Sequence, residues 1–249
     1  METTIPKTST VLAALVKADL ITQWRNRRAA ILALIVPVII LISWKGMIAK
    51  LGGPYTLSNS LCYGLIAIGL MGYSNSLSRD RDKGVFQRLR VAPVPTWAIM
   101  ASRLTVQLVM ILIVTTALYI VGYDFDKITL SPAGYVITYF TAIIGGAVYL
   151  ALGQLIVALT KNAETVNAAS RLVFLCFVVI GMFGSLGILG DTIEKMTQWS
   201  PYGTVKTIMA AGMVPGSWSM DTTYALLVTL GYTAVFATIG IKKFKWDIK

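Results

Sequence analysis

The chain has 249 residues, of which 56% are hydrophobic and only 13% charged, and its formal net charge is +11 at pH 7. Soluble domains carry about 25% charged residues, so this composition excludes an ordinary soluble fold and predicts a membrane protein. The basic residues are spread among short loops rather than gathered on one soluble face, which argues against nucleic-acid binding.

The first predicted element is a basic helix over residues 10–28. Leu12, Val16, Leu20 and Trp24 recur at intervals of four residues and would share one side of this helix. A basic amphipathic helix with a tryptophan, placed just before a spanning segment, is typical of helices that lie along a membrane surface. We therefore expect an N-terminal interfacial helix on the cytoplasmic side.

Six apolar runs follow, each near or above the roughly 20 residues needed to cross a bilayer. They lie at 29–45, 57–77, 97–121, 133–159, 171–190 and 222–241. Six spans place both termini on one side, and 17 of the 22 lysines and arginines then fall on that side, which marks it as cytoplasmic. The predicted fold is an all-α membrane protein with about six transmembrane helices in a single domain, residues 1–249.

The segment before the last span, residues 191–220, is too polar to cross the membrane and too apolar for a free loop. Pro201 stands near the middle of it. We expect a pair of short helices broken at Pro201, which form a re-entrant or interfacial element on the outer face.

The most charged segment, residues 79–93, lies between the second and third spans. Gly84 allows a sharp turn, and Pro93 ends the element before the next span. Between them, Val85, Phe86 and Leu89 form a small apolar face among polar and basic side chains. This pattern predicts a short cytoplasmic coupling helix that can insert into a groove on a partner protein and transmit its motion.

The run Asp80-Arg81-Asp82-Lys83-Gly84-Val85-Phe86-Gln87-Arg88-Leu89-Arg90-Val91-Ala92-Pro93-Val94 resembles the signature of the type 2 ATP-binding cassette (ABC) transporter permeases. In that family an acidic-basic-acidic-basic run, a glycine and usually a threonine precede a leucine and a proline. This chain has aspartates where glutamate is usual, and Val85 where threonine is usual. The resemblance extends to the surface helix, the six spans and the outer element with its Pro-Tyr pair.

The resemblance implies the transmembrane permease subunit of an ATP-driven exporter. In the family two permease chains, identical or homologous, pair around a pathway, and ATPase subunits dock on the N-terminal helix and the charged loop. The chain contains no G-x-x-x-x-G-K-[ST] phosphate loop, so ATP and Mg are expected in a separate nucleotide-binding subunit. The implied location is the plasma membrane, as the inner membrane of a bacterium or archaeon. The expected coupling residues are Arg81, Gly84, Phe86, Arg88, Leu89 and Arg90.

This chain itself is expected to be a transport subunit, not an enzyme, with no catalytic, cofactor-binding or metal-binding residues. It has no histidine, so imidazole-based metal binding and acid–base chemistry are absent. Its two cysteines, Cys62 and Cys176, both fall within apolar runs, which argues against a structural disulfide or a zinc site.

The substrate pathway is expected to be lined by neutral polar and aromatic side chains. Such a lining favours efflux of a hydrophobic or amphipathic cargo, such as a drug, an antibiotic or a lipid-like molecule. The candidate lining residues are Tyr63, Tyr73, Asn75, Gln107, Tyr139, Tyr149 and Gln154.

Two alternative functions are less well supported by the sequence than the export permease. A secondary transporter or ion channel, not coupled to an ATPase, usually keeps acidic or histidine side chains at mid-membrane, and the predicted spans carry none near their centres. A membrane enzyme or scaffold is the other alternative, and catalysis is disfavoured because no cluster of acidic residues falls on one predicted face. The export permease is therefore the favoured function, and the secondary transporter or channel is its alternative.

Overall fold

The computed structural model describes residues 7–25, 27–91, 95–184 and 190–244. Every regular element in these ranges is a helix. The all-helical architecture predicted from the composition is confirmed.

The first helix of the chain packs against the side of the bundle, and the second is followed by a sharp bend. Helix α1, Thr8–Arg25, packs against α7. Helix α2, Arg27–Ser43, contains Pro37 and is followed by α3, Lys45–Leu51, at an angle of 62°. A helix is thus present where the sequence predicted an interfacial one, and its position at a membrane surface stays a prediction.

The centre of the bundle is one long helical stretch with a π-helical interruption. It consists of α4, Gly53–Ile66; η1, Ala67–Tyr73; and α5, Ser74–Asp82. All residues from 56 to 70 are buried. A Cβ atom added at Gly69 would lie 2.5 Å from the backbone of Tyr149 on α8, so the missing side chain is what lets η1 and α8 approach closely.

The remaining helices surround this centre. They are α6, Val85–Val91; α7, Thr96–Asp124; α8, Pro132–Leu159; α9, Ala163–Val179, continued by η2, Ile180–Gly184; α10, Asp191–Trp199; α11, Pro201–Met213; η3, Pro215–Ser217; and α12, Met220–Lys243.

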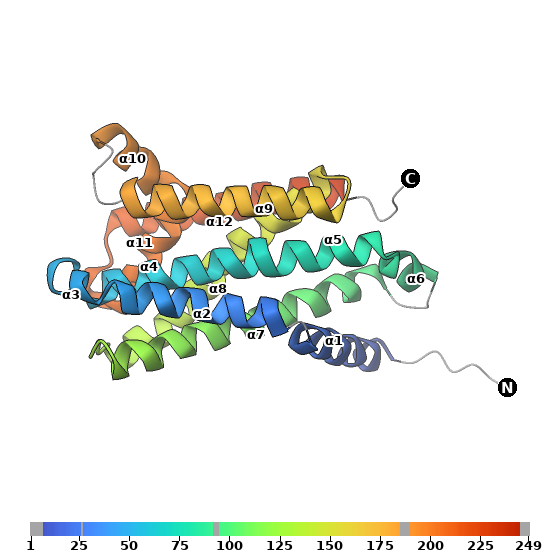
Figure 1. The fold of residues 1–249 in the computed structure, drawn as a ribbon, viewed down its shortest axis with the longest axis horizontal. Coiled ribbons are helices and arrows are strands. Elements are labelled where there is room, and N and C mark those ends of the chain that lie inside the picture. The colour runs from blue at the N-terminus through green and yellow to red at the C-terminus, as the bar shows by residue number, and fades with distance from the viewer. Residues whose placement is uncertain (1–6, 26, 92–94, 185–189, 245–249) are drawn as a thin grey trace.

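The two ends of the bundle differ in the helices they carry. Figure 1 shows α6, the start of α1 and the end of α12 at one end, and α3 and α10 at the other. The charged segment and the described chain ends therefore share one end of the molecule, which agrees with the predicted topology.

The outer element has the predicted break. Helices α10 and α11 meet at Ser200, whose side chain accepts a hydrogen bond from Gly203 N at 3.2 Å, and Pro201 is the first residue of α11. Helix α11 is mostly buried against α4, α8 and α12.

Four helices of the described residues are long and apolar enough to cross a membrane, or five if the bent pair α2–α3 forms one span. The four are α7, α8, α9 with η2, and α12. The predicted span at 57–77 lies in the stretch α4–η1–α5, which is helical throughout but interrupted by η1. A multi-span helical protein is confirmed, and the number six stays a prediction.

The helix that contains most of the predicted span at 171–190 starts before residue 171. Helix α9 starts at Ala163, because Asn162 caps it by accepting a hydrogen bond from Thr165 N at 2.8 Å. Arg171 therefore lies within the helix rather than at its start.

Candidate functional site

The charged segment folds as the end of α5, a tight turn and the short helix α6. The turn is at Gly84, which has a φ of +65°, a value that few residues other than glycine adopt readily. The backbone N–H of Gly84 donates to the carbonyl of Arg81 at 3.0 Å. The sharp turn predicted at Gly84 is thus present.

Helix α6 is anchored to the bundle by Phe86. This side chain is 0% exposed, and its ring meets the ring of Phe244 edge-on at a centroid distance of 5.8 Å. The guanidinium of Arg103 lies 5.0 Å from the centroid of the Phe86 ring, within the range of a cation–π contact. The sequence placed Phe86 in a partner's groove, whereas the structure places it in the interior of this chain.

The other residues of α6 are more accessible. Leu89 is half-buried against the core, whereas Gln87 and Arg88 are exposed. Arg88 also donates to the carbonyl of Lys83 at 2.8 Å, which closes the turn from the α6 side. The side chain of Arg90 lies outside the described part of the chain, so its predicted role stays a prediction. Among the described side chains of α6, Gln87 and Arg88 are therefore the ones available for contact with another protein.

Two residues at the end of α5 fix this segment to the neighbouring helices. Arg81 is buried and donates to the carbonyl of Val157 at 2.6 Å, near the end of α8. Burial lowers the pKa of the Arg81 guanidinium, and adjacent Asp82 opposes this shift. Asp82 also accepts a hydrogen bond from Ala163 N at 2.7 Å, at the N-terminus of α9, where a negative charge is favourable. Arg81 thus acts inside the chain, as a connection between α5 and α8.

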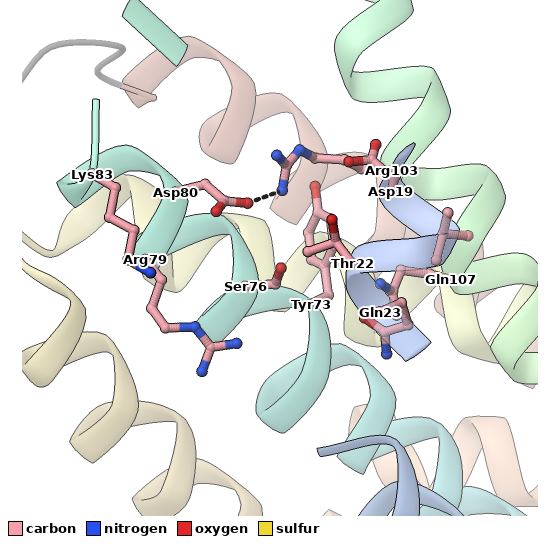
Figure 2. Close-up of a pocket in the computed structure, with 11 residues that line it drawn as sticks. Asp19, Thr22, Gln23, Tyr73, Ser76, Arg79, Asp80, Lys83, Arg103 and Gln107 are labelled. Carbon is pink, nitrogen blue, oxygen red and sulfur yellow. Dashed lines mark hydrogen bonds and ion pairs between the residues drawn. The ribbon is translucent and has the colours of Figure 1, made fainter. Parts of the chain in front are cut away.

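A polar cavity of about 250 Å³ lies among α1, α5 and α7 (Figure 2). An ion pair between Asp80 and Arg103 (2.6 Å) joins α5 to α7 along its wall, and Ser102 donates to Asp19, which joins α7 to α1. Its lining residues are Asp19, Thr22, Gln23, Tyr73, Ser76, Arg79, Asp80, Lys83, Arg103, Val106 and Gln107.

Two buried side-chain atoms of the residues that line this cavity have no hydrogen-bond partner within the described ranges. They are Arg103 Nε and Gln107 Oε1, and both residues line it. A polar space of this size can hold water molecules that satisfy such groups.

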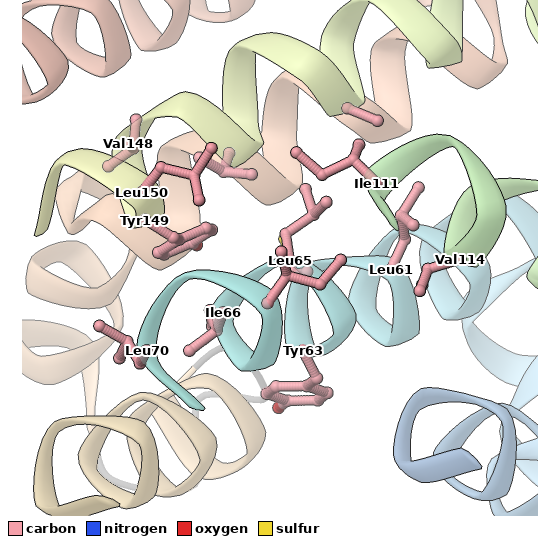
Figure 3. Packing of buried hydrophobic residues seen from close by; sticks show 14 of the residues in the cluster. Leu61, Tyr63, Leu65, Ile66, Leu70, Ile111, Val114, Val148, Tyr149 and Leu150 are labelled. Carbon is pink, nitrogen blue, oxygen red and sulfur yellow. The ribbon is translucent and has the colours of Figure 1, made fainter. Parts of the chain in front are cut away.

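The predicted pathway residues divide into three groups. Tyr73, Gln107 and Gln154 come together: Tyr73 and Gln107 line the polar cavity, and Tyr73 donates to Gln154 Oε1 at 2.8 Å. Tyr63 and Tyr149 belong to the packed interior, where Tyr63 stacks on Tyr202 at 5.6 Å and Tyr149 donates to the Pro201 carbonyl at 3.2 Å. Figure 3 shows both tyrosines among the leucine and isoleucine side chains of this core.

The third group comprises the two remaining candidates. Asn75 on α5 donates to the Met71 carbonyl on η1, and half-buried Tyr139 shares a hydrogen bond with the hydroxyl of Thr116 on α7. The structure therefore brings three of the seven candidates together, and whether a substrate passes them stays a prediction.

Sequence reasoning missed the partners that hold the charged segment. It assigned Arg103 no role beyond its share of the basic charge on one side, and it predicted no role for Phe244. The sequence contains a signal for Arg103, because this residue lies within the apolar run 97–121, and a charged residue in such a run usually has a partner or a function. The pairing of Phe244 with Phe86 links residues far apart in the chain and leaves no local signal.

Comparison with known proteins identifies the family of this chain. Residues 10–213 match the family model described as "ABC-2 type transporter". The chain is also 22% identical over 140 residues to the Bacillus subtilis (strain 168) protein named "Putative transport permease YvfS". That alignment covers 56% of this chain and 57% of the Bacillus protein, so the chain matches little more than half the length of this relative.

The family match includes the bent pair α2–α3, the stretch α4–η1–α5, the charged segment, and helices α10 and α11. It covers most of the chain, and it agrees with the apolar helices and with the resemblance of the charged segment. The chain therefore belongs to the ABC-2 type transporter family, as a multi-pass transmembrane permease.

Proposed function

We propose that this chain is the membrane subunit of an ATP-driven exporter and that α6 receives force from a separate ATPase subunit. The observation that carries the proposal is the geometry of α6. Gln87 and Arg88 are exposed on it, while Phe86 on the same helix is buried against Phe244 and Arg103. A partner that contacts the exposed side would therefore push on a helix that is fixed to α7 and to the end of α12.

The neighbouring contacts support transmission of such a push. Asp80 and Arg103 join α5 to α7, and Arg81 joins α5 to α8. Asp82 joins α5 to the start of α9. A displacement of α6 would thus act on several long helices together, because packed helices move as rigid elements rather than deforming continuously.

The remainder of the proposal concerns the assembly. ATP and Mg would be held by the ATPase subunit, and a second permease chain, identical or homologous, would complete the pathway. The excess of lysine and arginine at the α6 end supports a cytoplasmic location for both termini, in a plasma membrane. The ABC-2 family favours this function over a secondary transporter or channel.

A hydrophobic or amphipathic cargo is the proposed substrate class. Support comes from three neutral polar side chains, those of Tyr73, Gln107 and Gln154. Tyr73 and Gln107 line the polar cavity, and Tyr73 and Gln154 also border an apolar helix surface. Neutral polar groups within an apolar lining suit a ligand that is itself mostly apolar.

The proposal is tested by gentle purification from the native membrane, followed by mass spectrometry and an ATPase assay. We expect a soluble ATPase with a phosphate loop to co-purify in a fixed ratio and to hydrolyse ATP faster in the presence of hydrophobic compounds. Purification of the chain alone, together with ion-driven rather than ATP-driven transport in vesicles, would instead support the secondary transporter.

A further inference from the structure

A large groove lies on the side of the bundle formed by α7, α8 and α12, apart from the surface that α6 offers to a partner. Its volume is about 740 Å³, within the range of roughly 300–1,000 Å³ that is usual for small-ligand sites. Its walls are almost entirely apolar and include Trp97, Leu104 and Leu108 of α7, Ala147 of α8 and Ile241 of α12.

The hydroxyl groups in these walls are bonded within the protein, and the carbonyl oxygen of Gln154 accepts one of these bonds. Tyr73 donates to Gln154 Oε1 at 2.8 Å, and Thr233 donates to the carbonyl of Thr229 at 2.9 Å. Because these hydrogen bonds are already made, the groove presents hydrocarbon to whatever fills it. This favours an alkyl chain over a polar ligand.

The dimensions of the groove fit one leaflet of a bilayer. Trp97 and Leu108 both line it and are 11 positions apart on α7, which corresponds to about 16 Å along a helix. This is about half of the roughly 30 Å hydrocarbon core. The exposed ring of Trp97, at the α6 end, is of the type that lies at the membrane–water boundary.

The α6 end of the groove carries positive charge. Lys242 and Lys243 lie between Ile241 and Phe244, which both line the groove. Both lysines are exposed, and neither forms an ion pair with a carboxylate among the residues that the structure describes. Long lysine side chains at a helix end reach the level of the lipid headgroups, where a basic pocket between helices binds anionic ones.

We propose that this groove binds one acyl chain of an anionic phospholipid, with the headgroup against Lys242 and Lys243. The lipid enters from the leaflet at the α6 end, and its chain extends along α7 as far as Leu108. The site does not depend on the proposed transport function. Phe244 lines the groove and packs on Phe86, so a bound chain touches the ring against which the anchor of α6 packs.

The test uses the fluorescence of Trp97 in the full chain, reconstituted with its co-purifying subunits. Phospholipids with brominated acyl chains quench nearby tryptophans, and the difference between the wild type and Trp97→Phe isolates the Trp97 signal. We expect brominated phosphatidylglycerol to quench this signal at a lower mole fraction than brominated phosphatidylcholine with the same chains. Each lysine should contribute about fivefold to this preference.

Matched variants separate the two parts of the site. Lys242→Gln with Lys243→Gln should remove the preference for phosphatidylglycerol, whereas Lys7→Gln with Lys161→Gln removes the same charge from exposed positions elsewhere and should leave it. Ala147→Phe fills the groove and should weaken quenching by both lipids. Ala168→Phe, on an exposed position of α9, should not.

Three results would overturn the proposal. The first is equal quenching of Trp97 by the two lipids in the wild type, and the second is an equal loss of preference in both lysine variants. The third is a Trp97 signal that neither lipid quenches but that changes with the protein-to-lipid ratio, because a second copy of the chain would then cover the groove.

Discussion

The ring of Phe86 on α6 meets the ring of Phe244, just after α12, edge-on at a centroid distance of 5.8 Å, and Phe86 is fully buried there. The two residues are 158 positions apart in the chain. This contact joins a short helix with an exposed basic side to the last long helix of the bundle. Because of this contact, the charged segment is packed against the bundle.

Replacement of Phe86 by a smaller residue should loosen the packing of α6 against the bundle. Phe86→Ala should lower the free energy of unfolding by about 3–5 kcal/mol, because a fully buried aromatic ring is lost. Phe86→Leu should cost less and keep most of the ATPase stimulation. Thermal unfolding and the ATPase rate of the assembled complex measure both effects. Phe140→Ala, at an exposed position, is the control, and an equal effect there would show that burial of Phe86 is unimportant.

The turn before α6 should accept only residues that adopt a positive φ. Gly84→Pro should leave the protein in the membrane but uncouple it from its ATPase, because proline holds φ near −65°. Gly84→Asn should retain much of the activity, since asparagine tolerates this region. Membrane insertion and ATP-driven transport are the measurements. Transport by the proline variant at the wild-type rate would refute the coupling role.

The basic side chains of α6 should contribute to docking. Arg88→Glu with Arg90→Glu should weaken binding of the ATPase subunit roughly tenfold, because each reversal replaces an attraction worth up to about 1 kcal/mol with a repulsion. Titration of the purified subunit onto the permease at moderate salt measures this. Lys50→Glu with Lys195→Glu, at exposed positions of α3 and α10 at the other end of the bundle, changes the net charge equally, and similar weakening in that variant would assign the effect to overall charge.

The ion pair beside the polar cavity should be more important for stability than for docking. Asp80→Ala should lower the free energy of unfolding by about 1–3 kcal/mol, because the largely buried guanidinium of Arg103 loses its partner. Removal of both charges, as Asp80→Leu with Arg103→Met, should restore part of the loss. A double-mutant cycle by thermal unfolding tests this, and additive losses would exclude a coupling between the two residues.

The loop after α7 should give the protein a measurable pH dependence. Both carboxylate oxygens of Asp126 lack a hydrogen-bond partner within the described residues, and burial raises the pKa of this group while Lys45 opposes the shift. A carboxyl with a raised folded-state pKa binds its proton more tightly when folded. The free energy of unfolding should therefore rise as the pH falls through that pKa.

Asp126→Asn should be at least as stable as the wild type at neutral pH and should lose this part of the pH dependence. Unfolding measured across the acidic range is the readout, and Asp124→Asn, at the exposed neighbouring position, should keep the wild-type profile. An unchanged profile in the Asp126 variant would contradict the assignment.

Local features of the fold could be predicted from the sequence because their signals are local. Gly84 indicated the turn, Pro201 indicated the break between α10 and α11, and the apolar runs indicated the long helices. The π-helical stretch η1 left no such signal, since it arises where the helix packs closely on α8 through Gly69.

The candidate site was predicted less completely, because it depends on contacts between distant segments. The apolar character of Phe86 was recognised, but its partner could not be, and an apolar residue on a short helix serves equally well for docking or for anchoring. Arg81 is expected from the sequence to be a coupling residue, whereas its hydrogen bond to Val157 lies inside the chain. Only the fold distinguishes these roles.

The central claim is that the exposed side of α6 contacts an ATPase subunit. The most direct test places the photo-cross-linking residue benzoylphenylalanine at Gln87, on α6, or at Tyr123, an exposed residue near the opposite end of α7, in native membranes. Cross-linking of a phosphate-loop ATPase from position 87 and not from position 123 is the predicted result. No ATPase adduct from position 87, or equal adducts from both positions, would contradict the account.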